Sequence, residues 1–307
     1  MEKNIISNFV DYNNATHLKR QGDVIFTHPS QTKFIEDRCY ISFYMLDGTP
    51  VYIKDYWDIG KEDSAIYEIV VSHIMNECGV NSVPYYPILV DNKKKGFSLS
   101  SFCQDLESIK NIEFTQAADT VTPGVRLFTK NMWDFITREG VKQYLLAFMT
   151  LECYEQLKSE CVFDEITGMS DRHFGNYFFY KMDPKSKKYD GIINIDSALT
   201  WIFATKNYQV QNLAEFEINF GFFQYLDYDA VSALSLSNGS YEQRINKIKQ
   251  LFDKGYLGER QAKLIKKYLD CDLPARFRKE SERCGLKTNE AVVDFYSRTN
   301  EYLDKNF

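Results

Sequence analysis

The spacing of apolar residues changes once along the chain, near residue 105, and this change limits the folds that the chain can adopt. Before it, apolar and polar residues alternate in segments 38–46 and 51–57, with the turn sequence DGTP between them. This spacing predicts a β-hairpin. Residues 64–79 have one apolar face at helical spacing, which predicts an amphipathic helix. Residues 83–102 predict two further strands on either side of the charged turn DNKKKG.

After residue 105 the apolar spacing is mostly helical, in segments 131–159, 240–255, 259–269 and 289–303. One short pair of strands, 177–181 and 191–195, interrupts this part of the chain. We therefore expect an α+β fold of two lobes, a sheet-rich N-lobe over residues 1–105 and a helical C-lobe over residues 106–307. Ligand sites are common in the cleft between two such parts.

The composition argues against several classes of partner and site. The net charge of −6 disfavours the basic surface that binding to nucleic acid or to an anionic membrane requires. The seven cysteines are odd in number and form no Cys-x-x-Cys pair, which favours free thiols in a reducing cytosol. The N-terminus lacks the pattern of a signal peptide, and no apolar run approaches the roughly 20 residues of a membrane helix. We expect a cytoplasmic protein without direct contact to nucleic acid or membrane.

Four polar residues stand directly before the first strand of the predicted pair: Asp171, Arg172, His173 and Asn176. A hairpin brings the residues before its first strand close to those after its second strand, where Asp196 follows the apolar segment INI. Two carboxylates and an amide oxygen then converge, and such oxygen ligands suit Mg²⁺. Phosphoryl transfer needs an acid that orients the attacking hydroxyl, ligands for Mg²⁺ and a lysine on the phosphates. The residues therefore point to phosphate chemistry.

The segment FDEITGMSDRHFGN, followed by INIDSALT, resembles the HipA-like kinases and, more distantly, the phosphatidylinositol kinases. These families carry Asp-Arg-His-x-x-Asn or Asp-x-His-x-x-Asn in the catalytic loop, followed by an apolar strand that ends in Asp. Upstream, HPSQTKF is similar to their phosphate loop and VYIKDYW to the strand with the nucleotide lysine. AIYEIVVSHIMNECGVNSVPYY is similar to the helix that follows this strand. The resemblance covers about residues 25–200 and implies a bilobal protein-kinase-like fold.

The resemblance also implies a site and an activity. By their places in the motifs, the site residues would be the catalytic base Asp171, the Mg²⁺ ligands Asn176 and Asp196, the phosphate-binding Lys54 with its partner Glu68, and the phosphate-loop residues Ser30, Gln31 and Lys33. The cofactors would be ATP and Mg²⁺, and the acceptor a serine or threonine of a protein. Toxin-like members pair with a helix-turn-helix antitoxin, which implies such a partner. Compact members phosphorylate serines of their own phosphate loop, where Ser30 stands here.

Two alternatives would use the same residues. The first is a lipid or small-molecule kinase, although the net charge of −6 disfavours a lipid substrate. The second is a non-catalytic nucleotide-binding module. It is favoured by the phosphate loop, since no glycine occurs between Asp23 and Gly48 and the backbone would approach phosphates less closely. The complete set of Asp171, Asn176 and Asp196 favours an enzyme, because a binding module does not need it.

Overall fold

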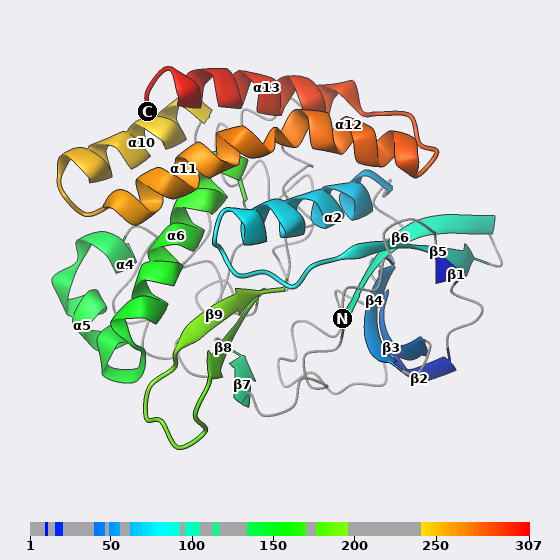
Figure 1. Ribbon diagram of the computed structural model, residues 1–307, viewed down its shortest axis with the longest axis horizontal. Coiled ribbons are helices and arrows are strands. Elements are labelled where there is room, and N and C mark those ends of the chain that lie inside the picture. Colours follow the sequence, from blue (N-terminus) through cyan, green and yellow to red (C-terminus); the bar gives the residue numbers. More distant parts are fainter. Residues whose placement is uncertain are drawn as a thin grey trace, which may run out of the picture.

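Figure 1 shows the computed structural model of the chain. The structure describes the backbone of residues 10–11, 16–20, 40–46, 49–55, 62–92, 96–104, 113–116, 134–169, 176–195 and 241–307, and the side chains of residues 65–87, 136–169, 176–195 and 241–307. The C-terminal helices lie along one side of the molecule, and helix α2 lies between them and the strands β5 and β6 (Figure 1). The fold is therefore a mixed arrangement of helices and sheets, as the sequence predicts.

The first sheet has six strands in the order β1-β5-β6-β4-β3-β2. They are β1 (Val10–Asp11), β2 (Thr16–Arg20), β3 (Tyr40–Leu46), β4 (Thr49–Asp55), β5 (Tyr86–Asn92) and β6 (Gly96–Gln104). Neighbouring strands are antiparallel, except that β1 and β5 are parallel. Leu46 pairs with Thr49 and Asn92 with Gly96, so both predicted strand pairs are confirmed. Strands β1 and β2 precede the segment in which the sequence predicts strands.

The second sheet has three antiparallel strands in the order β7-β8-β9. Strands β8 (Tyr177–Lys181) and β9 (Gly191–Asn194) form the predicted hairpin, in which Tyr177 pairs with Asn194. Strand β7 (Glu113–Gln116) is not predicted by the sequence and pairs with β8. With four residues, it is too short to show a periodic pattern of its own.

The predicted helix over residues 131–159 is wrong in its continuity, because three helices occupy this part of the chain. They are α4 (Asp134–Thr137), α5 (Glu139–Phe148) and α6 (Leu151–Thr167). Met149 has an extended backbone, and the peptide groups of Phe148 and Thr150 bond to Tyr189 of the β8–β9 loop at 2.9 Å each. The Thr150 side chain then caps α6 by accepting from the amide of Cys153 at 3.2 Å. The tertiary contact with Tyr189 thus interrupts the helical pattern.

The C-terminal helices over residues 241–307 are α10 (Tyr241–Asp253), α11 (Glu259–Cys271), α12 (Leu273–Arg283) and α13 (Glu290–Asp304). Three of these four, α10, α11 and α13, confirm the predicted segments, and α12 lies between the last two of them. Asp272 caps α12 by accepting from the amide of Ala275, and Asn289 caps α13 in the same way. Among the residues that the structure describes, no helix is long and apolar enough to cross a membrane.

Helix α2 (Glu62–Glu77) is buried on nearly all sides between residues 65 and 75, so the predicted one-sided burial is wrong. One hydrophobic core joins α2 to the helical part, and it contains Ile66 and Ile74 together with Leu264 of α11 and Tyr296 of α13. The opposite side of α2 lies near β5 and β6. The helix packs between two layers, and this explains why it has no solvent-facing stripe. The domain boundary at residue 105 stays a prediction.

Candidate functional site

The predicted site residues differ in what the structure says of them. Ser30, Gln31, Lys33, Asp171 and Asp196 lie outside the described residues, as do Arg172 and His173. The backbone of Lys54 lies in β4, a central strand of the six-stranded sheet, opposite Ile41 of β3 and Ser101 of β6. Glu68 lies on α2, and Asn176 lies directly before β8.

Asn176 and the residue before Asp196 meet at the open end of the β8–β9 hairpin. The amide of Ile195, which follows β9, donates to the carbonyl of Asn176 at 3.1 Å. Asn176 is 6% exposed. The backbone of Asn176 and that of the residue before Asp196 are therefore close together. An amide oxygen and a carboxylate, the groups that Asn176 and Asp196 carry, are donors of the kind that fit Mg²⁺.

The end of β9 is attached to the segment that joins α2 to β5. The amide of Asn194 donates to the carbonyl of Asn81, and its carbonyl accepts from the amide of Val83, each at 2.9 Å. The hydroxyl of Tyr85 donates to the carbonyl of Ile195 at 2.6 Å. The backbone N–H and C=O groups of Asn194 and Ile195 are thus all hydrogen-bonded, either to this segment or to Asn176. The backbone directly before Asp196 is therefore held in place.

The same segment is bonded to α2, the helix that carries Glu68. Ser72 accepts from the amide of Tyr85 at 3.0 Å, and Nε2 of His73 lies 3.0 Å from the carbonyl of Tyr85, to which it donates. Burial lowers the pKa of His73, so the ring is neutral at pH 7. Ile69, the neighbour of Glu68, packs with Tyr85 and with partly buried side chains of the β9 end. Helix α2 and the β8–β9 hairpin are therefore joined through the segment that follows α2.

Glu68 is 0% exposed. A position on the solvated face of a helix, the structural alternative to a role in the site, is excluded by this burial. A carboxylate inside a protein is costly unless it is hydrogen-bonded or paired with a cation. Its burial is compatible with the predicted pairing to Lys54, whose side chain lies outside the described residues. The pairing itself stays a prediction.

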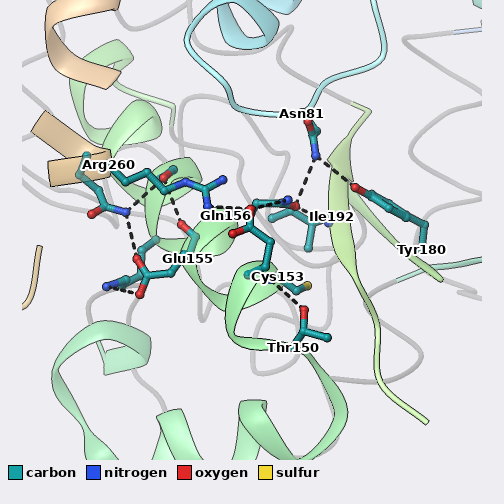
Figure 2. A network of polar contacts seen from close by, with 12 residues as sticks. Asn81, Thr150, Cys153, Glu155, Gln156, Tyr180, Ile192 and Arg260 are labelled. Carbon is teal, nitrogen blue, oxygen red and sulfur yellow. Dashed lines mark hydrogen bonds and ion pairs between the residues drawn. The ribbon is translucent and has the colours of Figure 1, made fainter. Parts of the chain in front are cut away.

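Gln156 on α6 connects three elements around the hairpin, as Figure 2 shows. Its Oε1 accepts from Nδ2 of Asn81 at 3.3 Å and from the amide of Ile192 in β9 at 3.1 Å. Its Nε2 donates to Glu152 at 3.2 Å, and Glu152 also pairs with Arg260 of α11 at 2.7 Å. The network thus joins the hairpin to α6 and then to the C-terminal helices.

A buried polar cluster surrounds the end of α6, shortly before the predicted catalytic loop. Gly168 ends the helix in a left-handed conformation, and the guanidinium of Arg244 packs directly on it. Burial lowers the pKa of Arg244, and the carboxylate of Glu165 opposes this shift. The hydroxyl of Tyr296 donates to the carbonyl of Thr167 at 2.9 Å. A cation at the C-terminal end of a helix also complements the helix dipole. Contacts from α10 and α13 therefore hold the end of α6.

Sequence reasoning did not identify the residues that hold these segments together. The motifs assign no role to Asn81, Tyr85, Gln156 or Asn194, and bonding partners of these residues lie far away in the chain. One signal was present in INID, because Asn194 is a polar residue within an apolar strand. A buried amide is expected to have a bonding partner, so this position could have been recognised as an anchor.

No protein-family model and no curated protein sequence matches the chain. Among solved structures, the chain is similar to the proinflammatory kinase CtkA of Helicobacter pylori, with 13% identity over 97% of this chain and 95% of that chain and a TM-score of 0.53. HipA of Shewanella oneidensis, solved with HipB and operator DNA, is 13% identical over 83% of this chain and 57% of that chain (TM-score 0.43). Choline kinase LicA of Streptococcus pneumoniae is 11% identical over 94% of each chain (TM-score 0.24). The similarity to CtkA, which alone of these three exceeds a TM-score of 0.5, shows that the chain has a kinase-like fold.

Proposed function

We propose that the chain is an ATP- and Mg²⁺-dependent phosphotransferase that transfers the γ-phosphate of ATP to a serine or threonine hydroxyl of a protein. The observation that carries this proposal is the hydrogen bond between Ile195 and Asn176, in a chain with a kinase-like fold. It joins the two halves of the motif that the sequence assigns to the metal. In this proposal the sheet-rich and helical parts are two lobes, and ATP binds between them.

Each polar residue of the motif has one task in the proposed reaction. Asp171 orients the acceptor hydroxyl and takes its proton as the hydroxyl attacks the γ-phosphate. Asn176 and Asp196 hold Mg²⁺, which when bound neutralises charge on the phosphates. Lys54 contacts the α- and β-phosphates, and Glu68 keeps its ammonium group in place. Fixed groups of this kind stabilise charge that develops in the transition state.

The phosphate loop contributes Ser30, Gln31 and Lys33, which cover the phosphates. We propose Ser30 as a site of autophosphorylation, because a phosphate there brings about −1.5 to −2 charges next to the γ-phosphate position. It would repel ATP or bind Lys33 and so stop the reaction. Mass spectrometry of the 24–36 peptide after incubation with ATP and Mg²⁺ tests this. A helix-turn-helix antitoxin is the proposed partner, and a small gene of that class next to this one would support it.

The deciding experiment measures transfer from ATP labelled on its γ-phosphate. The purified chain is offered protein, lipid and small-molecule acceptors, and label in protein supports the proposal. Asp196→Ala should abolish transfer and leave the circular dichroism spectrum unchanged. The matched control is Asp183→Ala, in the exposed loop at the far end of the same hairpin, which should retain transfer.

Three results would contradict the proposal in different ways. Label in lipid or in a small molecule would show that the acceptor is not a protein. Binding of ATP without transfer to any acceptor would favour the non-catalytic module. Normal transfer by Asp196→Ala would remove Asp196 from the metal site.

A further inference from the structure

A buried amide–carboxylate pair lies behind the end of β9. The Nδ2 of Asn194 donates to Oε1 of Glu160 on α6 at 2.6 Å, and both residues are 0% exposed. Glu160 lies outside the motifs from which the site was predicted, and Asn194 lies within INIDSALT but has no role assigned there. A hydrogen bond to a carboxylate is among the stronger ones in a protein, and this one is slightly shorter than the usual range for a nitrogen donor and an oxygen acceptor.

The pair gives β9 a second attachment to α6, in addition to the bond from the amide of Ile192 to Gln156. The peptide groups of Asn194 bond to Asn81 and Val83, in the segment after α2. Its side chain bonds instead to α6, so the residue is held by two separate parts of the fold. Asp196 follows two positions later, and the intervening Ile195 bonds to Asn176.

Helix α6 is also the element that ends just before the predicted catalytic loop. Glu160 lies seven positions before Thr167, which corresponds to roughly 10 Å along the helix axis. The end of α6 is held in turn by Tyr296 and Arg244. One rigid helix therefore relates the start of the loop to the end of β9.

A polar pair at this place is costly for stability. Taking an amide and a carboxylate out of water requires several kcal/mol that their mutual bond only partly offsets, and an apolar pair of similar volume is often as stable or more so. A polar pair fixes the relative orientation of the two elements that carry it, because a short hydrogen bond permits one arrangement of its partners whereas apolar contacts permit several. Fixed direction is useful where two metal ligands must meet at one ion.

We propose that Glu160 and Asn194 are positioning residues for metal binding, which fix the end of β9 so that Asn176 and Asp196 bind the same Mg²⁺–nucleotide complex. This inference rests on the proposed function. The pair acts through Ile195 and Asn176 and does not itself contact the ion.

The test measures binding of Mn²⁺, which replaces Mg²⁺, by electron paramagnetic resonance with a non-hydrolysable ATP analogue. Asn194→Asp removes the donor and sets two carboxylates against each other inside the protein. Loss of a residue that orients a metal ligand typically lowers metal affinity by about 10–100-fold, and we expect a loss in this range. Adding Glu160→Gln restores a donor opposite the new acceptor, so the double variant should return to within about threefold of the wild-type affinity.

Two further variants separate positioning from a general loss of folding. In Glu160→Met/Asn194→Leu both partners are apolar, so urea unfolding should show unchanged or higher stability, whereas Mn²⁺ affinity should fall by about 10-fold or more. The control is Gln143→Glu. Gln143 donates to Glu139 at 2.6 Å in a matching pair on the exposed surface of α5, so this change should leave Mn²⁺ binding unaltered.

The outcomes distinguish this inference from the proposed function. If the wild-type chain binds no Mn²⁺–nucleotide complex, the proposed function fails. If it binds the complex and the apolar pair binds it within twofold as well, the positioning role of Glu160 and Asn194 is refuted. Should Asn194→Asp not fold, the apolar pair still decides. The inference is also contradicted if the double variant Glu160→Gln/Asn194→Asp folds but binds Mn²⁺ as weakly as Asn194→Asp does.

Discussion

Replacing Gly168 by alanine should destabilise the protein more than the same change at Gly255, although both glycines have a φ of 74°. A β-carbon at Gly168 would lie 3.0 Å from Cζ of Arg244 and closer still to its Nη1, whereas at Gly255 it would meet nothing within 4 Å. The two changes share the same backbone strain. Their difference therefore measures how tightly Arg244 packs on the end of α6.

The magnitude follows from two terms. The left-handed conformation costs alanine about 1–2 kcal/mol, and the stiffer unfolded chain offsets about 0.4–1 kcal/mol of this. Gly255→Ala should therefore lower the free energy of unfolding by roughly 1 kcal/mol. At Gly168 the guanidinium must also move inside a closed site, since Arg244 is 6% exposed. Overpacking of a buried site adds about 1–3 kcal/mol, so we expect a total of roughly 2–4 kcal/mol.

Urea unfolding followed by far-ultraviolet circular dichroism measures both variants under one condition. The same comparison is then made in an Arg244→Leu background, where the guanidinium is absent. The excess cost of alanine at Gly168 should disappear there, because the pairwise term is removed. Equal losses at Gly168 and Gly255, or an excess that survives Arg244→Leu, would refute the packing argument.

Three further predictions each concern a single residue. Burial lowers the pKa of His73 below its unfolded value near 6.5, so the unfolded state binds more protons and the free energy of unfolding should fall as pH drops through 6.5. In His73→Gln this part of the pH dependence should be missing. The same pH dependence of urea unfolding in the variant and the wild type would contradict the prediction. Gly191→Ala should cost about 1–3 kcal/mol in urea unfolding, since its β-carbon would lie 2.7 Å from Cε1 of Tyr180, and Tyr180→Leu should relieve most of this loss. Lys54→Met should lower kcat/KM of transfer by about 100-fold or more, and the control is Lys61→Met. If both variants have near-normal kinetics, another lysine binds the phosphates.

The sequence predicted the elements whose apolar spacing is regular. Strands β3, β4, β8 and β9 and helices α10, α11 and α13 lie close to their expected places, because each shows a local pattern that tertiary contacts do not override. The expected helix over residues 131–159 failed at Met149, since its break depends on Tyr189, forty positions later. The predicted one-sided burial of α2 failed because periodicity shows only that one face is apolar, and cannot show that a second layer covers the rest.

The candidate site was predicted as a set of residues, and its supports were not. The hairpin argument correctly brought Asn176 near the residue before Asp196, because a two-strand pattern fixes which ends meet. The hydroxyl of Tyr85 acts on Ile195 across 110 positions, and Asn81 bonds to Gln156 across 75. Contacts at such separations leave no periodic trace in the sequence, so a structure is needed to find them.

The end of α6 shows most clearly why the polar supports escaped prediction. The sequence predicted a helical segment only as far as residue 159, and the turns that follow contain Glu160, Asp164 and Glu165. The helix in fact runs to Thr167, and all these residues are buried. Glu160 bonds to Asn194, and the carboxylate of Glu165 acts on Arg244, so distant partners make the burial tolerable. Natural chains depart from simple apolar patterning mainly near functional sites. Buried polar side chains in a helix directly before a predicted catalytic motif are therefore candidates for positioning that motif.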